Sequence, residues 1–375
     1  MKFIVSSEVL TSALQKVSGV LSAKSSLPIL NNYLFDIKGN QLTITASDIE
    51  TTMEVNLELS MADGEGTIAI PAKITLETLR TLPNTPVVFN IDEKTKAIEM
   101  STETGSFRNI GFDADEFPKI ASIEDSKTIT IPTAFLLRGL NKTHFATGND
   151  EMRPVMMGVN MEFTSKGVIF VGTDAHKLVK YVYSGTQSSE EDSIIFPKKP
   201  MNLLRSNLSG IQDEEVTIEY NQKNIRFKFD NFTMTSRLVN GKYPNYEVVI
   251  PVNNPNILVV DRASFLNTLR RVSIYANQST LQVRLSISGN SLKMSAEDVD
   301  FSNAGLEHLT VNYTGEDMDI GFNSKFLVEM LQNMDSEQVQ IEMSTPGRAG
   351  IIIPHGVDDD EESILMLVMP IMLGQ

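Results

Sequence analysis

The sequence predicts an α+β protein built from three copies of one domain, and three sets of repeated residues lead to this prediction. The first set consists of aspartates that follow strand-like runs, called here the repeat aspartates: Asp48, Asp174 and Asp298. The second set consists of lysines that begin helical patterns, called here the repeat lysines: Lys73, Lys199 and Lys325. An aromatic residue followed by proline, at 117–118 and 243–244, forms the third set. The separations are 124 or 126 residues throughout, so we interpret the chain as a triplication.

Each third is predicted to contain two amphipathic helices. The first helix of each third occupies the windows 7–24, 133–146 and 262–277, where apolar residues recur at spacings of three and four after a Ser, Thr or Asp that suits an N-cap. The second helix starts at the repeat lysine, in the windows 73–82, 198–208 and 324–334. Six helices are therefore expected.

Strand-like segments make up most of the remaining sequence. Segments 41–45, 167–171 and 291–295 run up to the repeat aspartates, are rich in strand-forming residues and end at turn-forming ones. Because strands and helices do not alternate regularly, a parallel Rossmann or barrel fold is disfavoured. Polar, turn-rich stretches at 124–126 and 253–255 predict three domains, at residues 1–125, 126–253 and 254–375.

Composition excludes several classes of protein. The chain has 375 residues and no cysteine, which removes disulfides, thiolate nucleophiles and zinc sites with cysteine ligands. No apolar run approaches the length of a membrane span, and the N-terminus lacks the apolar region of a signal peptide. We therefore expect a cytoplasmic protein with no membrane association.

Positive charge is concentrated in the predicted helices. The six helical windows contain 13 basic and three acidic residues, a balance of +10, whereas the rest of the chain has a balance of −26. Lysine-rich helix faces are common in solvated helices, which is the alternative explanation. If the helices share one surface, that surface offers phosphates a positive track. With no tryptophan in the chain, base stacking is disfavoured and backbone contact with a duplex is favoured.

No pattern of a catalytic or metal site is present. The four histidines are far apart, and no phosphate-binding glycine loop occurs. The acidic run at 358–362 lacks the ligand spacing of a calcium loop. We predict no catalytic residue, metal or cofactor, and we expect the repeat aspartates to form turns or caps. Two alternatives stay open: a hydrolase using Asp174 and His176, and a β-rich scaffold without a DNA role.

Over its whole length the chain resembles the bacterial β sliding clamp, the processivity subunit of DNA polymerase III. The matching segments are residues 25–37, 70–73, 172–178, 196–199, 236–251 and 368–373. The resemblance implies the DNA-clamp fold and a head-to-tail homodimeric ring, with helices around a central channel and antiparallel sheets outside. It also implies a protein without a catalytic site that encircles duplex DNA and tethers the DNA polymerase III catalytic subunit, the clamp loader and other proteins with a clamp-binding motif.

The same resemblance assigns residues to three sites. Duplex-facing cations would be Lys24, Lys73, Arg80, Lys198, Lys199 and Arg205. Dimer contacts would be Phe107, Ile274 and Tyr275. A cleft for partner peptides would be lined by Met156, Thr173, His176, Leu178, Pro244, Val249, Asn323, Phe326, Val368, Met369, Pro370 and Met372. Ala175 stands where the family usually has glycine.

Overall fold

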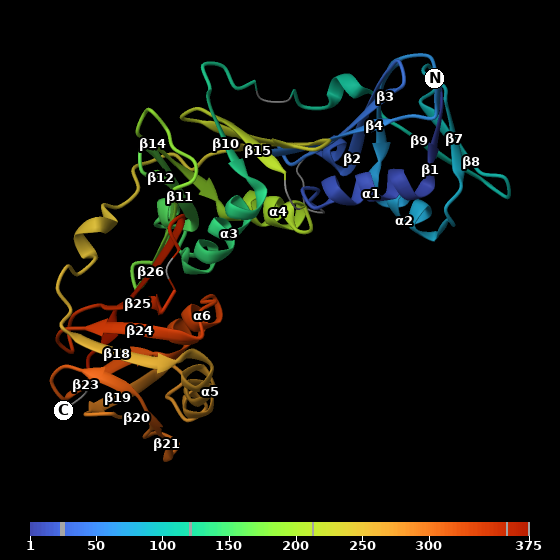
Figure 1. The fold of residues 1–375 in the computed structure, drawn as a ribbon. Helices are drawn as coiled ribbons and strands as arrows, with labels where there is room; N and C mark the ends of the chain where they lie inside the picture. Colours follow the sequence, from blue (N-terminus) through green and yellow to red (C-terminus); the bar gives the residue numbers. More distant parts are fainter. Residues whose placement is uncertain (23–26, 120–121, 212–213, 358, 374–375) are drawn as a thin grey trace. The chain divides into compact units, whose positions relative to one another are not determined.

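The computed structural model describes residues 1–22, 27–119, 122–211, 214–357 and 359–373, so Lys24 and Asp358 lie outside the described residues. The chain divides into two compact units (Figure 1). The first unit comprises Met1–Leu137 with Lys199–Leu238, and the second comprises Arg138–Lys198 with Val239–Gln375. Each unit contains two sheets, and their strand pairs are antiparallel.

The described residues form six α-helices, in the windows predicted. They are α1 (Ser7–Ser18), α2 (Ala72–Thr81), α3 (Thr133–Thr143), α4 (Lys198–Leu208), α5 (Arg262–Ser273) and α6 (Ser324–Gln332). Each begins directly after a strand, so a strand followed by a helix occurs twice in each third of the chain. Five short 3-10 helices are also described: η1 (Pro28–Asn31), η2 (Ala114–Glu116), η3 (His144–Ala146), η4 (Pro154–Met157) and η5 (Tyr246–Val249).

The first unit contains a five-stranded and an eight-stranded sheet. In spatial order the smaller sheet is β5 (Met61–Asp63), β1 (Lys2–Ser6), β7 (Pro86–Ile91), β8 (Ala97–Ser101) and β9 (Ser106–Ile110). The larger sheet is β10 (Lys127–Pro132), β15 (Glu215–Tyr220), β16 (Asn224–Phe229), β17 (Phe232–Arg237), β4 (Thr51–Glu58), β3 (Gln41–Ser47), β2 (Asn32–Lys38) and β6 (Gly66–Pro71).

The second unit contains a nine-stranded and a five-stranded sheet. The larger sheet is β14 (Asp192–Pro197), β11 (Gly158–Thr164), β12 (Gly167–Thr173), β13 (Lys177–Tyr183), β26 (Glu362–Val368), β25 (Gly350–His355), β24 (Gln338–Met343), β18 (Asn256–Asp261) and β22 (Asn312–Thr314). The smaller sheet is β21 (Asn303–Thr310), β20 (Ser291–Asp298), β19 (Gln282–Ser288), β23 (Met318–Asn323) and β27 (Pro370–Ile371).

Each large sheet joins strands from two neighbouring thirds of the sequence. In the first unit, β17 of the middle third pairs with β4 of the first, with Ser236 opposite Thr51. In the second unit, β13 of the middle third pairs with β26 of the last, with Lys177 opposite Val368. The two junctions are therefore built alike, because in both the joining strand directly follows the turn of a repeat aspartate.

The helices pack by apolar stripes, and four of them lie in two pairs. α1 lies beside α2 and α5 beside α6 (Figure 1). α6 buries Leu327, Met330 and Leu331, which recur at the spacing of one helix face. The first predicted window ends early, because Gly19 follows Ser18 and the chain turns there, with the Leu21 N–H bonded to the Ser18 carbonyl at 3.1 Å.

The repeat aspartates form turns, as predicted. Asp48 accepts a hydrogen bond from the backbone N–H of Thr51 at 2.8 Å. Asp174 accepts from the N–H groups of His176 and Lys177, both at 2.9 Å, and Asp298 accepts from that of Asp300 at 3.1 Å. A carboxylate that closes its own turn in this way satisfies backbone donors where a strand ends.

Candidate functional site

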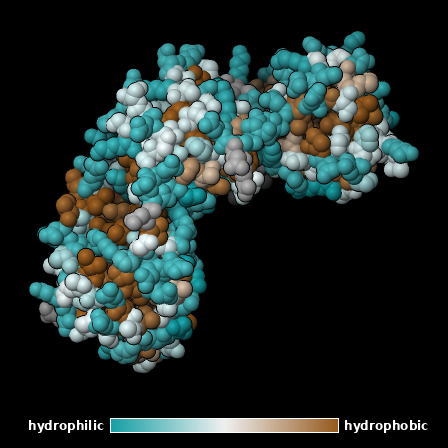
Figure 2. Space-filling view, in the orientation of Figure 1, coloured by the Kyte–Doolittle hydropathy of each residue, from teal (hydrophilic) through white to brown (hydrophobic). Residues whose placement is uncertain are grey.

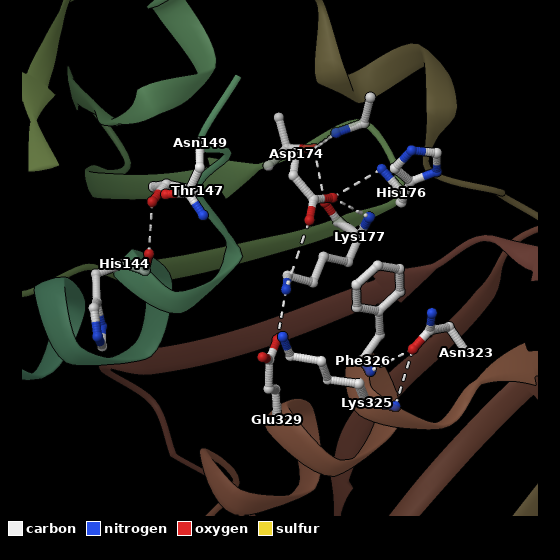
Figure 3. Close-up of polar contacts among 12 residues, drawn as sticks. His144, Thr147, Asn149, Asp174, His176, Lys177, Asn323, Lys325, Phe326 and Glu329 are labelled. Atoms are coloured by element: carbon white, nitrogen blue, oxygen red, sulfur yellow. Dashed lines mark hydrogen bonds and ion pairs between the residues drawn. The ribbon is translucent and has the colours of Figure 1, made fainter. Parts of the chain in front are cut away.

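One candidate site lies at the junction of β13 and β26 in the second unit, where a turn meets a helix (Figure 3). The turn after β12 presents His176 as an exposed side chain. Its ring lies nearly parallel to that of Phe326 on α6, with centroids 6.4 Å apart and planes at 20°. Asn323 caps α6 by accepting from the N–H of Lys325 at 3.0 Å, which fixes the start of the helix and the place of Phe326. Two predicted cleft residues from distant segments are thus in contact.

A buried lysine holds this turn to α6. The side chain of Lys177 is 6% exposed, and its Nζ lies 2.5 Å from Glu329 Oε2 and 3.6 Å from Asp174 Oδ2. The same Nζ lies over the ring of Phe326, 4.6 Å from its centroid. A buried ammonium needs such partners, because burial without them is costly. The sequence analysis assigns no role to Lys177, although this residue lies within the matching segment 172–178.

The end of the chain crosses this site from one sheet to the other. Val368 ends β26, and the N–H of Met369 then donates to the carbonyl of His176 at 2.9 Å. Pro370 pairs with Phe322 in β23, which belongs to the smaller sheet. The backbone of the terminal segment is therefore fixed beside the His176 turn.

The other predicted cleft residues differ in exposure. Leu178 and Val368 are buried. Thr173 is also buried, and its hydroxyl donates a hydrogen bond to the Lys177 carbonyl at 2.7 Å. Met156 and Pro244 are half-buried, and Val249, Met369 and Met372 are exposed. Figure 2 shows hydrophobic side chains at the surface of the second unit. Leu178 packs in one cluster with Tyr243, which precedes Pro244, and with Tyr246, which begins the 3-10 helix that ends at Val249.

Burial raises the pKa values of two groups here, Tyr246 of this cluster and its hydrogen-bond partner Glu162. Burial is the largest cause of the raised pKa of Tyr246, and the negative charge of Glu162 is the next largest. The Tyr246 hydroxyl donates a hydrogen bond to Glu162 Oε2 at 3.1 Å. Burial also raises the pKa of Glu162 itself. Lys180 lies over the Tyr246 ring, 5.5 Å from its centroid.

The predicted duplex-facing cations fall into two kinds. Lys73 and Arg80 are exposed on α2, and neither has a carboxylate within ion-pair distance in the part of the chain that the structure describes. Lys198 donates to Asn149 Oδ1 at 2.8 Å, and Arg205 donates to Asn202 Oδ1 at 3.1 Å. Burial lowers the pKa of both Lys198 and Arg205. Lys199 is ion-paired with Asp48.

The predicted interface residues lie at two sheet edges. Phe107 is exposed on β9, which ends the five-stranded sheet of the first unit. Ile274 and Tyr275 are exposed just after α5, and a Cβ placed on Gly305 of β21 would approach the Tyr275 ring to 2.7 Å. β21 ends the five-stranded sheet of the second unit. Further exposed apolar residues of these regions were missed by the sequence prediction: Ile110, Phe112, Val299, Phe301 and Leu306.

Among the described residues, no group of His, Asp or Glu side chains has the arrangement of a metal site. The described part of the acidic run forms a turn, in which Asp359 accepts from the N–H of Glu361 at 2.9 Å. Glu362 is ion-paired with Arg138 and accepts a hydrogen bond from the Tyr181 hydroxyl. No helix within the described ranges is long and apolar enough to cross a membrane.

Comparison with known proteins extends over nearly the whole chain. Three family profiles match in order: the N-terminal, central and C-terminal domains of the DNA polymerase III beta subunit, at residues 1–121, 130–245 and 247–371. The β sliding clamp of Haemophilus influenzae is 30% identical over 98% of this chain and 99% of its own. That of Pseudomonas aeruginosa is also 30% identical, over 98% of this chain and 100% of its own.

Solved structures agree with this match. A Pseudomonas aeruginosa sliding clamp bound to griselimycin superposes with a TM-score of 0.94 at 28% identity, with both chains fully covered. The DNA polymerase III beta subunit of Thermotoga maritima gives a TM-score of 0.90 at 25% identity, again with full coverage.

Three consecutive clamp domains with six helices and antiparallel sheets define a DNA clamp, a class of processivity factors that act without catalysis. The chain belongs to the family of the DNA polymerase III beta subunit, the bacterial β sliding clamps. Its function is that of a DNA sliding clamp that confers processivity on a polymerase. This finding excludes the hydrolase and the scaffold without a DNA role.

Proposed function

We propose that two copies of this chain close head to tail into a ring that encircles duplex DNA in the cytoplasm. The observation that supports this most directly is the pair of sheet edges. β9 and β21 each pair on one side only among the described strands, and both carry exposed apolar side chains. Because the two edges differ, β9 of one copy would pair with β21 of the other, a contact that closes into a ring. The repeat spacing supports domain limits at 1–125, 126–253 and 254–375.

A charge placed on one of these edges tests the dimer. Leu306 is exposed on β21, and Leu306→Lys should weaken self-association at least about tenfold, because a lysine at the centre of an apolar contact must lose its hydration. Sedimentation at micromolar concentration measures the monomer fraction. The matched control is Thr67→Lys, which puts the same charge on β6, another edge strand. Equal association of both variants and the native chain would contradict the proposed interface.

The cations Lys24, Lys73, Arg80, Lys198, Lys199 and Arg205 are proposed to face the duplex. The exposure of Lys73 and Arg80 without a carboxylate partner supports this role for α2. Contacts of this kind are independent of base sequence and weaken with salt, as a ring that slides requires. The net charge of −16 would keep nucleic acid away from the other surfaces.

The His176 site is proposed to bind the clamp-binding peptides of the DNA polymerase III catalytic subunit, the clamp loader and other partners. The contact of His176 with Phe326, the exposed Met369 next to His176, and the exposed Met372 of the same terminal segment support an apolar peptide ligand. Methionine side chains adapt to varied partners, and the fixed terminal backbone supplies a rigid wall. The ring would thus tether its partners to DNA and raise their local concentration.

Truncation of the aromatic wall tests this site. Phe326→Ala should lower the affinity for a labelled clamp-binding peptide of a polymerase about 30-fold, because aromatic anchors contribute roughly 2 kcal/mol. The control is Val357→Ala, an exposed apolar residue in a pocket with Arg138 and Tyr181 that includes neither His176 nor Phe326. Fluorescence anisotropy measures both, with thermal unfolding as a check on folding. An unchanged affinity in a folded Phe326→Ala protein would rule out the assignment.

A further inference from the structure

Several helix cations are neutralised by carboxylates of the chain itself. Of the 13 basic residues in the helical windows, 12 are described, and at least five of these lie within 4.0 Å of a carboxylate that the structure also describes. The pairs are Lys16 with Asp230, Arg138 with Glu362, Lys142 with Asp335, Lys199 with Asp48, and Arg271 with Glu307. Every one of these carboxylates lies outside the six helices. The acidic part of the chain therefore reduces the positive charge of the helices.

The pair of Lys199 and Asp48 shows most clearly how such a contact could compete with DNA. The Lys199 side chain is 60% exposed, so a phosphate can reach it. The Asp48 side chain is 11% exposed and is fixed by its turn with Thr51, so the carboxylate stays in place whether or not the lysine is bound to it. A phosphate that binds Lys199 therefore competes with a fixed carboxylate.

We propose that Asp48, with Asp335 as a weaker second case, competes with DNA phosphate for the helix lysines and so sets how loosely the clamp holds the duplex. Lys142 donates to Asp335 at 2.6 Å and to the Asn333 carbonyl at 2.6 Å, and its side chain is only 12% exposed. Freeing Lys142 from Asp335 would therefore present less positive charge to DNA. This inference rests on the proposed contact of the helices with DNA. A cation already paired with a carboxylate neutralises phosphate less, so it displaces fewer counterions from the DNA. Each such pair therefore makes DNA binding weaker and less dependent on salt.

Asp48→Asn isolates the effect. Asparagine keeps the oxygen that accepts from Thr51 and removes only the charge. The salt dependence of binding to a short labelled duplex should steepen by about 0.9 in the slope of log K against log salt, because one cation is freed. Between about 50 and 200 mM salt this difference amounts to roughly 3.5-fold in affinity. Asp335→Asn should change the slope less.

The matched control is Glu50→Gln, two residues further along the same turn. It removes the same charge, but its partner Arg237, at 3.2 Å, lies on β17 and not on a helix. The slope for Glu50→Gln should equal that of the native chain. A double-mutant cycle completes the test: in a Lys199→Met background, Asp48→Asn should have no further effect.

Two results would overturn the inference while leaving the DNA surface intact: equal slopes for Asp48→Asn and Glu50→Gln, or an effect of Asp48→Asn that persists without Lys199. A different result would overturn the proposed DNA contact itself, and the inference with it. This would be binding of the native chain that does not depend on salt and is unchanged in a Lys73→Met, Arg80→Met variant.

Discussion

At the scale of single residues, the proposed peptide site depends on one buried charge. Lys177 forms ion pairs with two carboxylates from different elements, one on the His176 turn and one on α6. It also lies over the Phe326 ring. The position of both aromatic side chains thus depends on a residue that no partner needs to touch.

Lys177→Met should lower the free energy of unfolding by about 2 kcal/mol, because it leaves Asp174 and Glu329 without their cation while both keep some contact with water. Adding Glu329→Leu should restore part of the loss, since an apolar pair avoids the unpaired charge. The control is Lys180→Met on the same strand. The ion-pair partner of Lys180 is the exposed Glu247, 3.6 Å away, so losing this pair should change the free energy of unfolding little. Denaturant unfolding measures all three. Equal losses for Lys177→Met and Lys180→Met would contradict the role of Lys177.

The residue before His176 is strained. Ala175 has a φ of 76°, a conformation that costs a residue with a Cβ about 1 kcal/mol or more. Ala175→Gly should therefore stabilise the protein by about 0.5 kcal/mol, after allowing for the greater freedom of glycine in the unfolded chain. Ala263→Gly in α5 is the control and should destabilise it, because its backbone is helical. A lower midpoint of thermal unfolding for Ala175→Gly would contradict this account.

At the scale of elements, local rules explain where helices begin. Asp261 caps α5 by accepting from the Ser264 N–H at 2.7 Å, and hydrogen bonds from Ser264 hold the pKa of Asp261 below its ordinary value of 3.8. Asn323 does the same for α6 as a neutral side chain. The first cap is therefore sensitive to acid and the second is not.

Asp261→Ala should destabilise the protein by about 1 kcal/mol near neutral pH. A lowered pKa in the folded state means that the stabilisation is complete above pH 3.8 and is lost as the pH falls through the folded-state pKa. The difference in unfolding midpoint between the variant and the native chain should therefore shrink in acid. Asn323→Ala is the control, and its effect should not vary with pH. A constant difference for Asp261→Ala would contradict the assignment of the cap.

Helices were easier to predict from sequence than the contacts between distant segments. The 3.6-residue spacing of Leu327, Met330 and Leu331 is local information, and it placed α6. The repeat aspartates revealed their turns for the same reason. By contrast, the pairing of Lys177 with Glu329 joins residues 152 positions apart, and no local pattern specifies it. The edge position of β9 and β21 likewise depends on how whole sheets assemble, so Leu306 and Ile110 could not be recognised in advance.

At the scale of the whole molecule, triplication places the same local structure at two junctions with different chemistry. The N–H of Met369 donates to the His176 carbonyl at one junction, and the N–H of Arg237 donates to the Glu50 carbonyl at the other, both at 2.9 Å. The junction of the first unit thus carries the ion pair of Arg237 and Glu50, where the junction of the second unit carries His176 and a methionine. One repeated scaffold therefore provides one apolar site and one charged surface.

A clamp that holds DNA by encircling it should be released at free DNA ends. The direct measurement loads the protein with a clamp loader onto a nicked circular duplex and then linearises the circle with a restriction enzyme. The bound protein should remain on the intact circle and be lost from the linear DNA, and blocking both ends with a bulky bound protein should prevent the loss. Retention on linear DNA with free ends would contradict the claim.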